Sequence, residues 1–273
     1  MKIENHRLVQ DDGTPYPFQA TLNFDDQIIQ PEYLVMHYTA GGSAESAVNW
    51  LCNPTAQASA HLVIGRDGSI TQLIEFNKYG WHAGVSRWRG REGLNRYSIG
   101  IELDNAGKLT RQGGGWAAWF GTVYDDSQVL QATHPKDTGP AGWHIYTPEQ
   151  IEVAAQVASL LVQTYQLLDV IGHEDINLQK VDPGPAFPMA SFRARAMGRR
   201  DDQVTLFKAT AALNIRSGPG TQYDPIRGSP LPVDTPVEIL KTQGNWSFVA
   251  VKATIKKLND LEGWVYNSYL IKA

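Results

Sequence analysis

Residues 172–185 read GHEDINLQKVDPGP and say more about this chain than any other segment. His173 follows the end of an apolar run, and Asp182 stands nine positions later, directly before Pro-Gly-Pro. Proline and glycine exclude a helix there and favour a fixed turn, which can hold a carboxylate in one direction. An imidazole and a carboxylate held in this way are good zinc ligands. The segment therefore offers two ligands for a metal site.

A zinc site needs a third protein ligand, and His37 is the candidate. It ends the apolar run 33–36, which predicts a buried strand, and it lies just before the Gly41-Gly42 turn. Three protein ligands leave the fourth zinc position for water, which is the pattern of a catalytic site rather than a structural one. On spacing alone, a histidine at a strand end is more often a packed or surface residue, so both interpretations stand at this point.

Strands and helices alternate around these residues. Residues 43–51 predict a short helix capped by Ser43, and residues 147–150 (TPEQ) predict the start of a long helix through a capping box with proline at the first helical position. Asp67-Gly68 between two apolar runs predicts a hairpin. In residues 98–103 (SIGIEL), the isoleucines and the leucine share one face and Glu102 lies on the other. This alternation predicts an α/β domain.

Composition narrows the class of protein. The 273 residues are 42% hydrophobic, and their formal net charge is −4. This apolar content can fill a core, which excludes disorder as the main state, and the acidic balance excludes a strongly basic nucleic-acid-binding protein. No stretch of about 18 uncharged apolar residues predicts a membrane span. The single cysteine, Cys52, cannot close an intramolecular disulfide, and we expect it to be a buried small apolar residue.

The composition changes near residue 207. From Lys208 onward there are 8 basic and 5 acidic residues, and short apolar runs are separated by turn signals without a helical period. We expect two domains, residues 1–200 and 207–273, with a boundary near 200–207. The second domain is predicted to be a small all-β barrel.

Four motifs occur in an order that resembles the type 2 N-acetylmuramoyl-L-alanine amidase family, in the branch that acts on anhydromuramyl peptides. They are the sequence after the first strand, residues 37–39; the run 81–84 (WHAG); the run 98–103; and the segment 172–185. The resemblance covers about residues 30–190. It implies a zinc amidase fold of the α/β class, with a mixed central sheet flanked by helices. The C-terminal part, through residues 213–220, Trp246 and residues 263–265, resembles the bacterial SH3-like domain.

The resemblance also implies roles for single residues. His37, His173 and Asp182 would hold one Zn²⁺ ion. Glu102 would be the carboxylate that accepts a proton from the attacking water, and Lys180 would stabilise the oxyanion. The general chemistry agrees, because zinc lowers the pKa of bound water and a nearby carboxylate can act as a base.

Other residues have two open interpretations. Trp81, His82 and Asn95 are expected to line the substrate groove, with core packing as the alternative. His61 is expected to hydrogen-bond in the core, and three further histidines are expected at the surface: His6, His134 and His144. The connection between residues 105 and 146 predicts a long functional or mobile loop. Its tryptophans, Trp116, Trp119 and Trp143, either stack on sugar rings or form a small cluster under the loop.

The expected activity is hydrolysis of the amide bond between N-acetylmuramic acid and L-alanine of the stem peptide, on peptidoglycan or muropeptides. The alternatives are a peptidoglycan-binding protein without catalysis and a zinc peptidase that cuts within the stem peptide. The SH3-like domain is expected to target the cell wall, or else to pack on the amidase domain as a lid. Residues 1–18 contain no apolar signal segment, so the protein is expected in the cytoplasm, exported by another route or released by phage lysis. A monomer is the default expectation.

Overall fold

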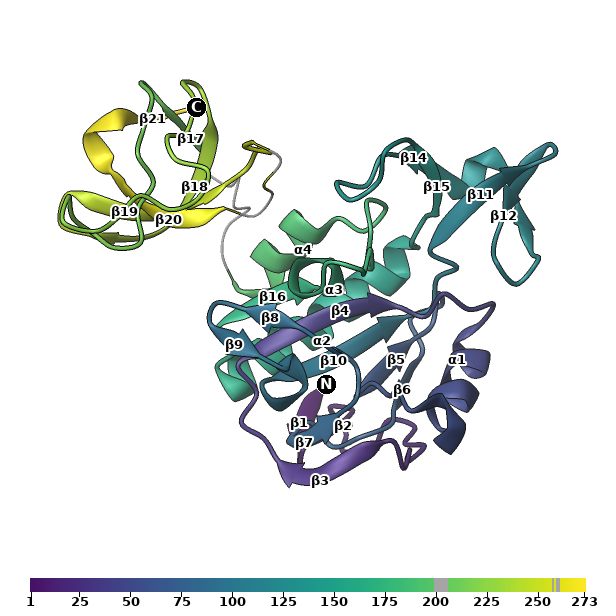
Figure 1. Ribbon diagram of the computed structural model, residues 1–273. Helices are drawn as coiled ribbons and strands as arrows, with labels where there is room; N and C mark the ends of the chain where they lie inside the picture. Colours follow the sequence, from purple (N-terminus) through teal and green to yellow (C-terminus); the bar gives the residue numbers. More distant parts are fainter. Residues whose placement is uncertain (199–205, 257, 259–260) are drawn as a thin grey trace. The chain divides into compact units, whose positions relative to one another are not determined.

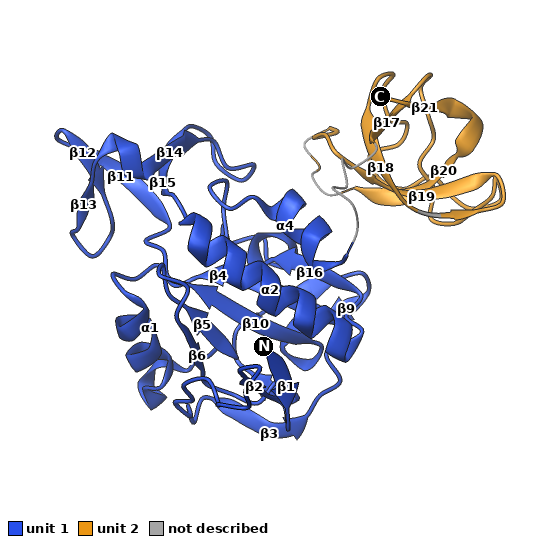
Figure 2. Cartoon of the chain, turned by 180° about the vertical axis from the view of Figure 1, so that it is seen from behind, with its two compact units in different colours: residues 1–201 blue, residues 202–273 orange. Residues whose placement is uncertain are grey.

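The computed structural model describes residues 1–198, 206–256, 258 and 261–273. The chain forms two compact units, Met1–Asp201 and Asp202–Ala273 (Figure 2). The boundary expected near residues 200–207 falls mostly outside the described residues, so it stays a prediction. Among the helices in the described part of the chain, none is long and apolar enough to cross a membrane.

A mixed five-stranded sheet forms the centre of the first unit, as the sequence predicts (Figure 1). The strands are parallel, except that the edge strand β6 runs antiparallel to β5. Parallel strands are covered on both faces, which explains why β4 is buried from Tyr33 to His37 and mostly apolar. In spatial order the strands are β16 (Asp169–Gly172), β4 (Tyr33–Tyr38), β10 (Ser98–Leu103), β5 (Leu62–Ile64) and β6 (Ile70–Gln72).

Helices α2 (Pro148–Tyr165) and α4 (Met189–Ala196) cover one face of this sheet, and Figures 1 and 2 show α2 across the sheet from opposite sides. The predicted start of α2 is confirmed, because the Thr147 side chain accepts a hydrogen bond from the Gln150 N–H. The main core lies between this face and the helices, and it contains Leu34, Met36, Ile99, Ile101 and Leu103 from alternate positions of the two central strands. Residues in between, such as His37 and Glu102, therefore point to the opposite face.

Shorter elements surround this frame. Helix α1 (Ala44–Leu51) begins at Ser43 with the predicted cap, and α3 (His173–Ile176) directly follows β16. Cys52, at the end of α1, is half-buried rather than fully buried. Three two-stranded ribbons are present: β1 (Lys2–Glu4) with β2 (Arg7–Val9), β3 (Phe24–Ile28) with β7 (Lys78–Gly80), and β8 (Arg87–Trp88) with β9 (Arg91–Glu92). The 3₁₀ turns are η1 (Pro54–Ala56), η2 (Leu94–Arg96), η3 (Asp126–Gln128) and η4 (Asn267–Tyr269).

The connection between residues 105 and 146 is a folded subdomain, which corrects the prediction of a long loop. It contains a five-stranded antiparallel sheet with its own apolar cluster around Leu109 and Trp116. His134 and His144, which we expected at the surface, are buried in it, and Nδ1 of each ring accepts a backbone N–H of this segment, from Lys136 and Ala106. We call residues 105–146 the inserted sheet. Its strands, in spatial order, are β13 (Val123–Tyr124), β12 (Gly115–Ala117), β11 (Lys108–Gln112), β15 (Ala141–His144) and β14 (Val129–Ala132).

The second unit is a five-stranded antiparallel sheet around a small apolar core that includes Ile215, Val237, Val249 and Val265. The described residues of this unit contain no α-helix, in agreement with the predicted all-β domain. The strands, in spatial order, are β20 (Glu262–Tyr266), β19 (Trp246–Val251), β18 (Pro236–Gln243), β17 (Leu206–Ala209) and β21 (Leu270–Lys272).

Candidate metal centre and active site

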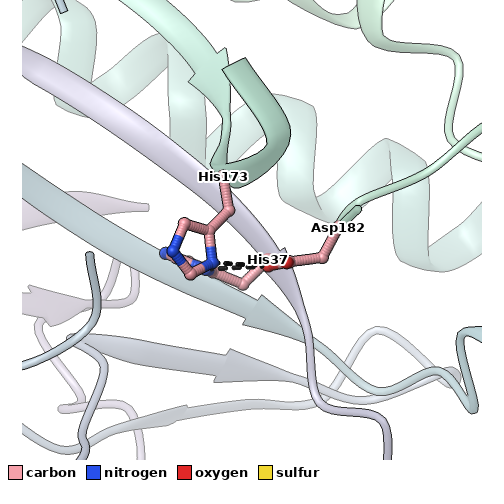
Figure 3. A group of neighbouring side chains, drawn as sticks. All are labelled: His37, His173 and Asp182. Carbon is pink, nitrogen blue, oxygen red and sulfur yellow. Dashed lines mark hydrogen bonds and ion pairs between the residues drawn. The ribbon is translucent and has the colours of Figure 1, made fainter. Parts of the chain in front are cut away.

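The three predicted metal ligands lie together, as Figure 3 shows. His37 comes from β4, His173 is the first residue of α3 after β16, and Asp182 comes from the following loop. Strands β4 and β16 are parallel neighbours, so their carboxyl ends meet at the same edge of the sheet. The Nδ1 atoms of the two histidines and Oδ2 of Asp182 are each 3.0 Å from the other two. In the described part of the chain this is the one cluster with such metal-binding geometry.

This triangle of atoms fits a zinc ion better than it fits a network of protons. Each imidazole Nδ1 carries at most one hydrogen, so one hydrogen cannot satisfy three mutual contacts between lone-pair-bearing atoms. Ligands about 2.0–2.1 Å from a tetrahedral zinc ion stand roughly 3.3–3.4 Å apart, close to the separation seen here. Two imidazoles and one carboxylate also form a donor set that zinc accepts. The residues present therefore fit the ion that the sequence predicts.

The protonation states suit a metal as well. Burial, together with the nearby His173, lowers the pKa of His37 to about 4, so its ring is neutral at neutral pH. Burial opposes ionisation of Asp182. Hydrogen bonds from the two imidazoles outweigh this effect and lower the pKa of the carboxyl below its ordinary value. Neutral imidazoles and an ionised carboxylate are the forms that bind metal. Asp182 thus offers a negative charge to a cation, and His37 offers a neutral ring.

A second histidine fixes the ring of His37. Nε2 of His37 lies 3.0 Å from Nδ1 of His82, and Nε2 of His82 lies 3.3 Å from the carbonyl oxygen of Ser98. If Nδ1 of His37 faces a metal, its Nε2–H donates to His82, whose own Nε2–H donates to Ser98. The ring of His82 packs on β10 where a Cβ at Gly100 would come within 2.5 Å of it, so this strand position requires glycine.

His82 and Asn95 are both buried, and His82 contacts the ring of His37. The Asn95 side-chain oxygen accepts the backbone N–H of His82 and of Ala83, at 3.0 and 2.6 Å. This placement favours positioning of His37 over the substrate contact expected from the sequence. Trp81 is half-buried, and its indole N–H points to Asp25 on β3 at 3.4 Å.

His61 behaves as the sequence suggests. Its Nδ1 accepts the Gly100 N–H and its Nε2 donates to the carbonyl of Lys78, each at 3.0 Å. Both nitrogens are therefore used by backbone groups. The burial of this ring lowers its pKa to about 4, so it is a neutral core residue rather than a ligand.

Glu102 is placed by strand register. It pairs directly with His37 across β4 and β10, so the two side chains leave the sheet on the same face. Its Oε2 atom is buried and has no hydrogen-bond partner. Burial, and then the charge of Asp182, raise the pKa of Glu102 to about 8, while Lys180 acts in the opposite direction. The arrangement gives a carboxyl group that can take up and release a proton near neutral pH.

Lys180 is exposed, and its charge influences both Glu102 and His37. The loop that carries it is held by Lys136 of the inserted sheet. The Lys136 ammonium donates to the backbone carbonyls of Glu174, Asn177 and Lys180, the last two at 2.8 Å. One cation thereby binds three carbonyl groups of the segment between two predicted zinc ligands.

Two more contacts join the inserted sheet to this loop. His134 Nε2 lies 2.8 Å from the carboxylate of Glu174, the residue after His173. Trp143 packs on the turn after Asp182, where a Cβ at Gly184 would lie 2.7 Å from the indole ring and φ is +74°. Sequence reasoning missed Lys136 and His134, because their partners are 38–44 positions away and are mostly backbone atoms.

Comparison with known proteins agrees with this geometry. Residues 27–185 match the family model described as N-acetylmuramoyl-L-alanine amidase, and residues 211–271 match the bacterial SH3 domain. The 1,6-anhydro-N-acetylmuramyl-L-alanine amidase AmpD of Enterobacter cloacae is 30% identical over 225 residues, which cover 75% of this chain and 100% of that protein.

Two further matches cover less of the chains or have lower sequence identity. The N-acetylmuramoyl-L-alanine amidase AmiD of Escherichia coli is 30% identical over 179 residues, which cover 62% of this chain and 54% of that protein. Among solved structures, a selenomethionine derivative of AmpD superposes with a TM-score of 0.50 at 27% identity, covering 71% of this chain and 99% of that one.

Proposed function

Since the chain belongs to the N-acetylmuramoyl-L-alanine amidase family, we propose that it hydrolyses the amide bond between N-acetylmuramic acid and L-alanine of the stem peptide, with one zinc ion at its centre. The observation that carries the zinc dependence is the triangle of His37, His173 and Asp182, with 3.0 Å between each pair of ligand atoms. The substrate is peptidoglycan or a muropeptide derived from it.

A zinc ion held by these three residues would polarise the scissile carbonyl and lower the pKa of a water molecule toward about 7. Glu102 acts as the general base and then as the general acid. It accepts a proton from the attacking water and returns it to the leaving nitrogen of L-alanine, a role worth about 10²–10⁴-fold in rate. Its raised pKa, about 8, supports this role, because the group must both gain and lose a proton in one cycle.

Lys180 stabilises the oxyanion that develops on the scissile carbonyl. Its ammonium group is exposed at the loop between the second and third ligands, which supports this placement. Removing one such electrostatic donor typically costs about 10²–10³ in kcat. Lys136 acts only through the loop, so it is a positioning residue.

Two other functions compete with this proposal. A peptidoglycan-binding protein without catalysis would not need an intact ligand set and a buried carboxylate beside it, and this chain has both. A zinc peptidase would use the same centre on a bond within the stem peptide. The products distinguish these possibilities, because only the amidase releases an intact peptide and a free muramic acid.

The decisive experiment is mass spectrometry of purified muropeptides after digestion with the zinc-loaded protein. We expect an intact stem peptide that begins with L-alanine. Glu102→Gln should lower this release by about 10²-fold or more, whereas the exposed carboxylate variant Glu149→Gln should keep wild-type release. Shortened peptides would indicate the peptidase, and no cleavage by the wild-type protein would indicate the binding protein.

The metal is tested separately. Elemental analysis should find one zinc ion per chain, and chelation should abolish release until zinc is restored. His173→Ala and Asp182→Ala should each lose the ion. Full activity in the presence of chelator would overturn the zinc dependence while leaving the amidase activity in place.

A further inference from the structure

Trp119 differs sharply from the other tryptophans of the inserted sheet. Trp116 and Trp143 are 7% and 1% exposed and pack in the interior, whereas Trp119 is 80% exposed. The sequence left open whether these residues stack on sugars or pack under the connection. The structure separates them, because two belong to the interior and one presents its ring to solvent. An indole exposed to this degree has a large apolar surface that the fold itself does not use.

The exposed ring is held in place. Its Nε1–H donates to the carbonyl of Ala40 at 2.6 Å, and its edge meets Phe120 with the ring centroids 5.8 Å apart and the planes at 89°. Phe120 in turn lies against the backbone at Gly42. The single polar atom of the indole is therefore already satisfied by the protein. What remains for a ligand is flat apolar ring surface in a fixed orientation.

The Trp119 ring lies near the metal centre, because its hydrogen-bond partner Ala40 is close to His37 in the sequence. Ala40 is three residues after His37, so their Cα atoms are at most about 11 Å apart. Trp119 thus lies at the border of the site, on residues 38–42 that leave the strand carrying the first ligand.

We propose that Trp119 is a sugar-stacking subsite, which binds a hexose ring of the glycan next to the muramic acid under attack. This inference rests on the proposed amidase function and names its substrate class, which is a glycan of more than one sugar that carries stem peptides. A pyranose ring presents apolar C–H groups on its faces, which match a flat indole. Because the ring is already fixed, little conformational entropy is lost on binding.

Charge favours the sugar over the stem peptide as the occupant. Stem peptides carry carboxylates, which need cationic or N–H partners when they bind. Trp119 is held by the Ala40 carbonyl and the Phe120 ring, and neither is a cation or a free donor. A neutral amino sugar needs no such partner at its stacked face.

The binding test uses the full chain in chelator, so that it does not depend on catalysis. Calorimetric titration with a tetramer of N-acetylglucosamine should give saturable binding, accompanied by a shift of the Trp119 indole N–H resonance. Trp119→Ala should weaken the affinity about tenfold, equivalent to about 1.4 kcal/mol. Trp119→Phe should keep part of it, because a flat ring remains. Trp50→Ala, which removes another exposed tryptophan (56% exposed) of the same unit, should change nothing.

The turnover test compares two substrates with the zinc-loaded protein. One is muramyl dipeptide, which has a single sugar, and the other is a tetrasaccharide of alternating sugars with stem peptides. Trp119→Ala should lower kcat/KM about tenfold on the tetrasaccharide, mainly through KM, and leave the single-sugar substrate unchanged. An equal loss on both substrates, in Trp119→Ala and Trp119→Phe alike, would mean that the indole only holds residues 38–42, and would overturn the proposal.

Two further outcomes are informative. A shift of the indole resonance by free stem peptide and not by the sugar tetramer would overturn the sugar assignment. If the wild-type chain cleaves nothing but the tetramer still binds at Trp119, the amidase function fails and the sugar subsite stands. The two hypotheses are therefore separable.

Discussion

At the scale of single residues, the orientation of His37 depends on a second imidazole rather than on the carboxylate or carbonyl that usually supports a zinc ligand. When Nδ1 of His37 faces a metal, its Nε2–H donates to His82, and the Nε2–H of His82 donates to the Ser98 carbonyl. Asn95 holds the backbone on which His82 sits. Each hydrogen bond in this series fixes which ring nitrogen carries the hydrogen.

Loss of this support should weaken metal binding. His82→Gln should lower the zinc affinity about 10–100-fold, the usual effect of removing a partner of a metal-binding histidine. Competition with a fluorescent zinc chelator measures this directly. His6→Gln, which alters an exposed histidine, serves as the control and should bind zinc like the wild type. Equal affinity in all three proteins would contradict the supporting role of His82.

The raised pKa of Glu102 predicts how the stability of the metal-free protein depends on pH. Its pKa is about 8 in the folded chain, against 4.5 ordinarily, so its contribution to stability is full below pH 4.5 and is lost as pH rises through 8. Glu102→Gln removes this penalty. The free energy of unfolding of the variant, relative to that of the wild type, should therefore increase as the pH rises from about 5 to about 8, by a few kcal/mol at most.

Urea unfolding of both proteins in chelator, at several pH values, provides the measurement. Zinc should reduce the effect, because a nearby cation favours the ionised carboxyl. A difference between the proteins that stays constant from pH 5 to pH 8 would show that Glu102 ionises normally.

The sequence was informative for some of these residues and silent for others. The ligands His173 and Asp182 stand out because a turn rich in proline and glycine follows an apolar strand, and alternation in residues 98–103 places Glu102 on the face opposite the core. The partnership of His82 with His37 depends on a close approach over Gly100 between segments 45 residues apart. No local pattern reports such an approach, so the sequence predicts a substrate contact for His82 and Asn95 and does not reveal their link to His37.

At the scale of elements, the inserted sheet was the least predictable part of the chain. Its strands are only two to five residues long, and glycine-rich turns separate them, so the sequence has the composition of a loop. The resulting subdomain supports the site from one side, through Lys136, His134 and Trp143. The two central strands, β4 and β10, were predictable because each has six residues with a marked apolar pattern.

The Lys136 contact predicts a link between the inserted sheet and catalysis. Lys136→Met keeps the aliphatic stem but leaves three backbone carbonyls without their donor, which should cost about 1–3 kcal/mol of stability. Because the same loop carries Lys180 and Asp182, kcat should fall about tenfold or more, with a smaller change in KM.

Thermal unfolding and steady-state kinetics on one muropeptide measure the two effects. Lys108→Met is the matched control, since its ammonium pairs with Asp137 and lies 5.9 Å from the centre of the Trp143 ring, both in the same subdomain, rather than on the loop carbonyls. If Lys136→Met lost stability but kept wild-type kcat, the loop would not depend on this contact for catalysis.

At the scale of the whole molecule, each of the two units has an apolar core of its own. The resemblance of each unit to its family is confirmed by the matches to residues 27–185 and 211–271. The all-β character of the second unit was predictable because short apolar runs alternate with turns. Its ligand was not, because bacterial SH3-like domains share a framework and differ in what their loops bind.

Removal of the second unit should separate binding to the wall from chemistry. A chain ending at residue 201 should cleave a soluble muropeptide with kcat/KM within about twofold of the full chain, because all three metal ligands, Glu102 and Lys180 lie in the first unit. We expect it to sediment less with insoluble peptidoglycan. Co-sedimentation and kinetics on the two proteins provide the test, and equal sedimentation would assign wall binding to the first unit.

The direct pairing of His37 with Glu102 across β4 and β10 has a consequence for protein design. The proposed metal ligand and proton acceptor are spaced here by the pairing of two parallel strands, whose separation of about 4.8 Å varies little between sheets. The pair is therefore a transplantable unit. Any parallel sheet with room on one face should accept it, provided that a loop at the same edge supplies the remaining two ligands.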